Sequence, residues 1–128
     1  MKSAREILVA LAAFALLNSG AAFAHHGTAN YDTNKLITVK GAVTGFQFIN
    51  PHVIIALDVK DEKGAVVNWQ GELTSPNRLT RTGWTKDSLK AGQVISLSGF
   101  PSKTGAPEIW IQKVMLADGT ELKTDGGN

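Results

Sequence analysis

The chain has 128 residues, three histidines and no cysteine, and its 13 basic and 11 acidic side chains give a formal charge of +2. This length suits one domain with a modest core. The near balance of charge, without a cationic run, argues against nucleic acid or an anionic membrane surface as a partner. The lack of cysteine excludes disulfide bonds and thiolate metal sites.

Residues 1–24 have the three parts of a secretory signal peptide. Two basic residues near the start precede an apolar stretch over residues 7–17, and Ala22-Phe23-Ala24 forms a small-x-small cleavage site. The stretch has 11 residues, whereas a membrane-spanning helix, the alternative, needs about 20. We therefore expect cleavage after Ala24 and a periplasmic protein of 104 residues without a stable membrane anchor. Cleavage removes two basic and one acidic residue, which leaves a formal charge of +1.

Alternating apolar residues predict strands over residues 36–49, 53–59 and 66–73. In the first of these, the apolar face changes phase near Gly45, as in a long, bent strand with a bulge. The residues expected to point inward are Ile37, Val39, Val43, Phe46, Phe48, Val53, Ile55, Leu57, Val59, Val67, Trp69 and Leu73.

A short helix and two further strands are expected to follow. Ser75 suits a helix cap, Pro76 a first helical turn, and Gly83 the end of the helix. Two apolar runs, residues 94–100 and 108–116, then predict strands joined by a loop that contains proline and glycine.

Three strands, a helix and two strands match the five-stranded, partly open Greek-key barrel called the OB-fold. We therefore predict an all-β, OB-like barrel over residues 36–122, with one short helix between strands three and four. Residues 25–35 would form a lead-in segment and residues 123–128 a flexible tail. A β-sandwich is the alternative, but it needs more strands.

Several sequence segments resemble a family of small, exported bacterial proteins of unknown function. They are AHHG at residue 24, GAVTGFQFINPHV at residue 41, DEKGAVVNWQGEL at residue 61, the long segment that starts SPNRLTRTGW at residue 75, and LADGTEL at residue 116. The resemblance covers nearly the whole mature chain. It implies export and a shared fold, and it supplies no activity, substrate or catalytic residue.

The histidines are the candidate metal ligands. Cleavage after Ala24 would place the α-amine and the imidazole of His25 together, so that both can chelate one metal ion. A cut after Ala22 would instead make His25 the third residue, which suits a square-planar copper or nickel site. His52, at the corner between the first two strands, would add a third nitrogen if the lead-in segment folds back. We predict a copper site of His25, His26 and His52.

Two alternatives remain for these histidines. The pair at the mature start is otherwise the solvated beginning of a terminus. His52 is otherwise a residue that satisfies backbone groups within its own turn.

A ligand site beside the corner is also expected. Its predicted residues are Asn50, Arg78, Arg81, Trp84 and Trp110. Trp110 lies on a strand that is apolar on both faces, as expected if one face meets the lead-in segment or a ligand. Core packing of the tryptophans and a solvated helix face for the arginines are the alternatives.

Catalysis is not expected. The nearest candidates are His52, Asp58, Glu72 and Ser75, and no spacing or motif joins them. We therefore predict a non-catalytic, exported binding module whose partner is a metal ion or another exported protein. The alternative is an interaction domain that docks on a protein or a saccharide through the open barrel face, without metal.

Overall fold

The structure is a computed structural model that describes residues 27–124. Within that range no helix is long and apolar enough to cross a membrane. The elements are β1 (Ile37–Gln47), β2 (Ile54–Lys60), β3 (Val66–Glu72), α2 (Pro76–Thr80), β4 (Val94–Pro101), β5 (Glu108–Leu116) and β6 (Glu121–Leu122).

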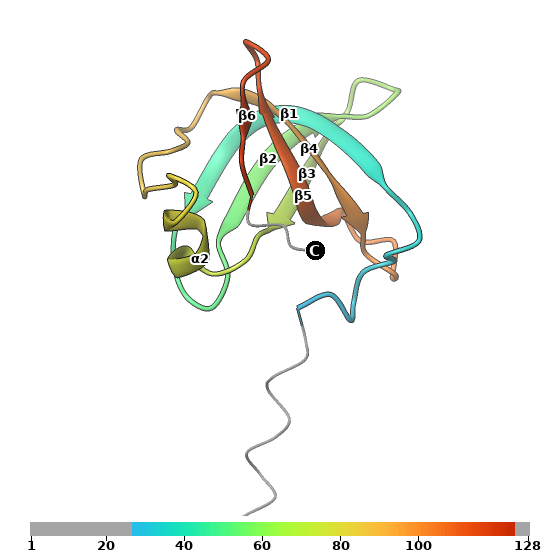
Figure 1. Cartoon of the computed structure of the whole chain (residues 1–128). Helices are drawn as coiled ribbons and strands as arrows, with labels where there is room; N and C mark the ends of the chain where they lie inside the picture. Colours follow the sequence, from blue (N-terminus) through green and yellow to red (C-terminus); the bar gives the residue numbers. More distant parts are fainter. Residues whose placement is uncertain (1–26, 125–128) are drawn as a thin grey trace, which may run out of the picture.

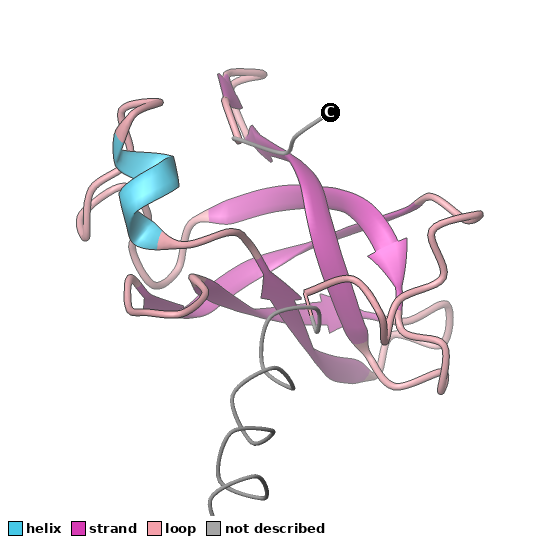
Figure 2. Ribbon diagram, turned by 60° about the horizontal axis from the view of Figure 1, so that its bottom comes forward, coloured by secondary structure: helices cyan, strands magenta, loops and turns pink. Residues whose placement is uncertain are grey.

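The strands form one sheet that closes on itself as a barrel (Figures 1 and 2). Its order is β3-β2-β1-β4-β5-β6, and a parallel pairing of β3 with β5 closes it. The prediction of an all-β, OB-like barrel with a short helix between strands three and four is confirmed. The two-residue strand β6 was not predicted, because two residues are too few to show an alternating pattern.

β1 bends so that its two halves pair with different neighbours. Its first half pairs with β4 and its second half with β2, and the register shifts between Val43 and Gly45. The predicted bulge near Gly45 is confirmed. Gly41 lies where the backbones of β1 and β2 approach closely, since a Cβ atom there would be 2.2 Å from the carbonyl oxygen of Asp58.

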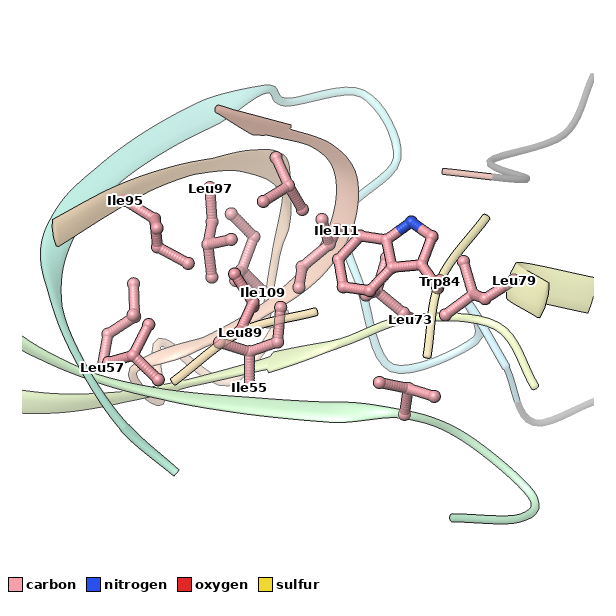
Figure 3. Close-up of a cluster of buried hydrophobic side chains, with 13 residues drawn as sticks. Ile55, Leu57, Leu73, Leu79, Trp84, Leu89, Ile95, Leu97, Ile109 and Ile111 are labelled. Carbon is pink, nitrogen blue, oxygen red and sulfur yellow. The ribbon is translucent and has the colours of Figure 1, made fainter. Parts of the chain in front are cut away.

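The core lies inside the barrel and extends to the segment around α2 (Figure 3). Of the residues predicted to point inward, five are buried: Val43, Val53, Ile55, Leu57 and Leu73. Seven are half-buried, and of these all but Val67 pack against the buried cluster: Ile37, Val39, Phe46, Phe48, Val59, Val67 and Trp69. The buried cluster comprises Val43, Val53, Ile55, Leu57, Leu73, Leu79, Trp84, Leu89, Ile95, Leu97, Ile109, Ile111 and Val114.

The segment around α2 covers one end of this core. Pro76 and Leu79 of the helix are buried. Ser75 occupies the predicted N-cap position, but its side chain makes no capping hydrogen bond. Gly83 has a φ of 97°, a left-handed conformation that glycine adopts without strain, and the chain then turns Trp84 into the core.

Two residues of the expected tail make hydrogen bonds. The Lys123 carbonyl accepts hydrogen bonds from Thr82 and Trp84, and the Thr124 hydroxyl donates to the Gln112 carbonyl at 2.7 Å. Residues 125–128, the expected signal peptide and the first two residues of the lead-in segment lie outside the described residues.

Leu57→Asp is expected to unfold the domain. Leu57 has no exposed surface, and a buried carboxylate without a partner costs several kcal/mol, against a total stability of about 5–15 kcal/mol. Val66→Asp, on the exposed face of β3, is the matched control and should change stability by less than about 0.5 kcal/mol. Thermal unfolding followed by circular dichroism measures both, and an unchanged melting temperature of Leu57→Asp would contradict the inward register of β2.

Candidate functional site

The described part of the lead-in segment, residues 27–35, is attached to the loop between β4 and β5 (Figure 1). Tyr31 forms an antiparallel bridge with Ser102. The Asp32 amide donates a hydrogen bond of 2.8 Å to the carbonyl of Pro101. The segment therefore crosses one end of the barrel before β1 begins.

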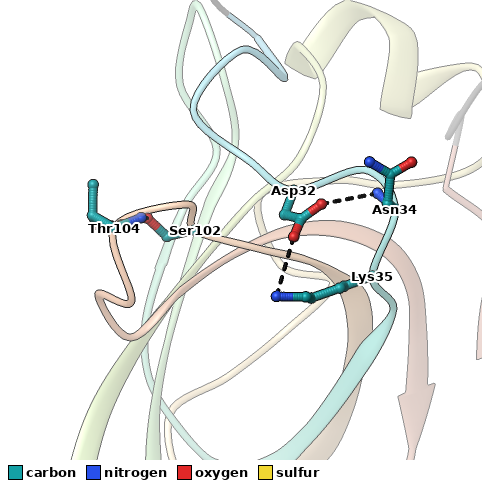
Figure 4. A network of polar contacts seen from close by, with 5 residues as sticks. All are labelled: Asp32, Asn34, Lys35, Ser102 and Thr104. Carbon is teal, nitrogen blue, oxygen red and sulfur yellow. Dashed lines mark hydrogen bonds and ion pairs between the residues drawn. The ribbon is translucent and has the colours of Figure 1, made fainter.

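Local turns hold both sides of this attachment (Figure 4). The Asp32 carboxylate accepts a hydrogen bond of 3.1 Å from the Asn34 amide and pairs with the Lys35 ammonium at 3.3 Å. An aspartate bound to the amide two residues ahead makes a compact turn. In the facing loop, the Ser102 and Thr104 hydroxyls lie 3.0 Å apart. These contacts are structural, and they fix where Tyr31 enters the barrel end.

Four residues meet at this end: Tyr31, His52, Glu72 and Trp110, which we call the His52 cluster. Glu72 pairs with Ile54 of β2 on one side and with Trp110 of β5 on the other. His52 lies two residues before Ile54, just ahead of β2, and the Val53 backbone next to it is hydrogen-bonded to Leu73 and Thr74, which brings His52 alongside Glu72. The barrel closure thus brings a histidine and a tryptophan from the two strands that flank β3 to the same carboxylate.

Glu72 binds two side chains at once. Its Oε2 atom accepts a hydrogen bond of 2.8 Å from the Tyr31 hydroxyl, and its Oε1 atom is bound to Nδ1 of His52. An ionised carboxylate can only accept, so in such a pair Nδ1 is the donor, and a neutral ring in this tautomer has its lone pair on Nε2. Within residues 27–124, no hydrogen bond uses that Nε2 atom. The His52 side chain is 31% exposed, so a ligand from solvent can reach the ring.

Trp110 forms the apolar wall of the cluster. The His52 ring stands edge-on to the indole with the ring centroids 5.3 Å apart, and the Tyr31 ring is tilted against it at 5.8 Å. A Cβ atom at Gly27 would lie 3.4 Å from the same indole. Of the two alternatives for this face, the lead-in segment or a ligand, the structure shows the lead-in segment against it.

Tyr31 is a neutral donor held by its surroundings. Its side chain is buried, and burial raises its pKa well above the ordinary value. The hydrogen bond to Glu72 and the negative charges of Glu72 and Glu108 raise this pKa further. The hydroxyl therefore keeps its proton, and its hydrogen bond to Glu72, throughout the neutral pH range.

The structure separates the predicted ligand-binding residues. Trp110 belongs to the His52 cluster, and Asn50 is exposed in the loop that carries His52. Arg78 and Arg81 are exposed on α2 and at its C-cap. The prediction for Trp84 is corrected, because its side chain lies in the core and is only 3% exposed. Its indole nitrogen donates a hydrogen bond of 2.8 Å to the Lys123 carbonyl, so no ligand can stack on the ring.

Of the four candidates for acid–base chemistry, two lie in contact in the structure, and no sequence motif indicated this contact. His52 and Glu72 are in contact, whereas Asp58 is bound to the side chain of Asn68 and Ser75 lies at the start of α2. Tyr31, the third member, escaped the sequence reasoning. Its one signal was a single aromatic residue in a polar segment.

The metal prediction depends on residues outside the described range. His25 and His26 both lie there. In residues 27–124, no group of three or more histidine, cysteine, aspartate or glutamate side chains is arranged to hold a metal ion.

Residues 13–109, most of the chain, match the sequence profile of a protein family. The chain belongs to DUF6152. DUF6152 is a family of unknown function, so the predicted membership of a family without an assigned function is confirmed, and membership supplies no activity.

No curated protein matches this DUF6152 chain. Among solved structures, it is similar to the ZRD-deleted mutant of TiaS, crystallised in complex with agmatine, with 21% sequence identity and a TM-score of 0.44. The match covers 75% of this chain and 26% of that chain, so the DUF6152 chain spans about a quarter of its length. This similarity says nothing about a ligand.

The raised pKa of Tyr31 predicts a loss of stability at high pH. The unfolded chain releases the tyrosine proton near pH 10 and the folded chain retains it, so the free energy of unfolding falls as the pH rises above about 10. Tyr31 is the chain's one tyrosine, so the phenolate absorbance reports it alone. Denaturant unfolding at several pH values, with Tyr31→Phe as the control, isolates its share. Ionisation of the folded protein at an ordinary tyrosine pKa would contradict the buried hydrogen bond.

Proposed function

We propose that this chain is an exported, non-catalytic binding module that holds one copper ion between its mature N-terminus and His52. The observation that carries the proposal is the pair of His52 and Glu72 beside the docked lead-in segment. Glu72 holds Nδ1 of the ring, which leaves Nε2 as the atom available to a metal. The lead-in segment reaches the same place, because Gly27 packs on the indole that His52 also contacts.

The chemistry of His52 supports a metal ligand. Histidines that bind metals nearly always donate their other ring N–H to a carboxylate, a carbonyl or water. The carboxylate fixes the tautomer and the ring orientation, and it makes the ligating nitrogen more basic. Glu72 is placed to do this at His52, and Tyr31 and Trp110 hold the two residues from the other sides.

The length of the chain also supports the site. His25 precedes Gly27 by two residues, and consecutive α-carbons are about 3.8 Å apart. Two such steps span at most about 7.6 Å, so the chain is long enough for His25 to reach the His52 cluster. Once the signal peptide is removed, His25 would offer an amine and an imidazole that chelate one ion, and copper is the divalent metal with the highest affinity for such nitrogen ligands.

The free Nε2 atom of His52 suits a ligand. Within the described residues, Nδ1 is committed to Glu72, and no serine, threonine or tyrosine hydroxyl is bound to Nε2. A nitrogen in this state can donate its lone pair to a metal ion.

A second function is favoured by the loop that carries His52. Ile49 is 55% exposed, and Asn50 and Pro51 beside it are exposed too. OB-folds use the loop between their first two strands to bind oligomeric ligands. The alternative is therefore a domain that docks on another exported protein or a saccharide. Such docking should survive the loss of the His25 amine and the His52 imidazole, and copper binding should not.

Export predicts a defined mature start. Chain expressed with its leader and recovered from a bacterial envelope should begin at His25, because Ala22-Phe23-Ala24 is the best small-residue cleavage site. Intact-mass and N-terminal peptide mass spectrometry measure this directly. Ala24→Leu, which spoils the cleavage site, is the control and should shift or block processing. Recovery of chain that still starts at Met1 in the membrane fraction would contradict the prediction.

Copper binding is the second test. Protein that begins at His25 should bind one copper(II) ion, and His52→Ala should lower the affinity at least tenfold because it removes the nitrogen that only the fold supplies. One extra residue before His25 should also weaken binding, since it breaks the amine–imidazole chelate. Calorimetric titration with spectra recorded for each sample measures these effects.

Two controls separate a built site from an accidental one. Asn68→Ala, four residues before Glu72 on β3, removes a polar side chain outside the cluster and should bind copper as the parent does. A synthetic peptide of residues 25–35 measures what the free tail binds alone. Equal affinities for the parent, for His52→Ala and for the peptide would rule out the three-nitrogen site.

A further inference from the structure

Tyr31 joins the lead-in segment to the barrel at a point that the backbone contacts do not reach. The backbone attachment runs along the loop between β4 and β5, through Asp32 and Pro101. The Tyr31 hydroxyl instead crosses to β3 and donates to Glu72 at 2.8 Å. Glu72 is 41 residues away in the sequence, so this hydrogen bond exists only in the folded barrel.

The carboxylate of Glu72 is shared between this hydrogen bond and His52. Tyr31 occupies Oε2 and His52 occupies Oε1. A carboxylate held at both oxygens cannot rotate without breaking a hydrogen bond, so its position, and that of the ring bound to it, is fixed. The orientation of His52 therefore depends on a residue of the lead-in segment that does not touch the ring's nitrogens.

We infer that Tyr31 is a positioning residue: its hydroxyl latches the lead-in segment onto Glu72, and the carboxylate held in this way fixes the His52 ring. This inference rests on the proposed copper function and adds the contact that orients the ligating ring.

Tyr31→Phe isolates the hydroxyl. The buried phenyl ring can keep its packing against Trp110, and only the donor to Glu72 is lost. Losses of such outer hydrogen bonds typically lower metal affinity about 10- to 100-fold, and we expect about tenfold here because Tyr31 acts through Glu72. The matched control is Lys103→Met, which removes the ammonium contact to the Ala29 carbonyl. That contact holds the same segment without reaching Glu72, and its loss should change affinity less than twofold.

The experiment is a double-mutant cycle on chain exported with its own leader and verified to start at His25. Copper(II) affinity is measured by calorimetry for the parent, Tyr31→Phe, His52→Ala and the double variant. The latch predicts that Tyr31→Phe weakens binding in the parent and has no effect when His52 is absent. Equal affinity of Tyr31→Phe and the parent overturns the inference. An equal loss with and without His52 also overturns it, because Tyr31 would then act on the tail alone.

A metal-free measurement keeps the inference separate from the proposed function. Nitrogen-15 NMR of the His52 ring reports which nitrogen carries the proton. The parent should show the proton on Nδ1, and both Tyr31→Phe and Glu72→Gln should shift the tautomer populations. If the parent binds copper no better than His52→Ala, the proposed function fails. The NMR measurement then tests the positioning role of Tyr31 by itself. Unchanged ring nitrogens in both variants would then overturn the latch.

Discussion

The candidate site depends on the short parallel pairing that closes the barrel between β3 and β5. Only three residue pairs make this seam, from Gln70 to Glu72 on β3. A Cβ atom at Gly71 would lie 2.5 Å from the Ile111 side chain, so a larger residue there would have to displace packed core side chains. The closure sets Glu72 beside Trp110, and the lead-in segment and the corner at His52 both attach to that pair.

The position of Glu72 at the rim explains how the barrel tolerates a polar cluster. Its side chain is 22% exposed, and both of its oxygens have partners. A carboxylate at the preceding position, Gly71, would meet the buried side chains of Ile111 and Leu97, where an unpaired charge costs several kcal/mol. Water at the rim reduces that cost, and the hydrogen bonds of Tyr31 and His52 give the carboxylate one defined orientation.

The cluster has the features of a site that was built to hold one group in place. A histidine, a carboxylate and a phenol come from three distant parts of the chain, and an indole covers them on one side. Outer hydrogen bonds of this kind orient metal-binding histidines. The two proposals depend on different atoms of this cluster. Copper binding needs the Nε2 atom of His52, and the latch needs the Tyr31 hydroxyl, which acts on His52 through Glu72.

The sequence by itself determined the barrel. Alternation along each strand reports which side chains are buried, and this local property predicted the five barrel strands, the bulge near Gly45 and the short helix. The tertiary structure alone decided the candidate site. Tyr31, His52 and Glu72 are brought together by the β3–β5 register and the docked lead-in segment, and no local pattern encodes contacts between residues 20 to 41 positions apart. Trp84 shows the same limit, because a tryptophan in a loop has no period from which burial can be predicted.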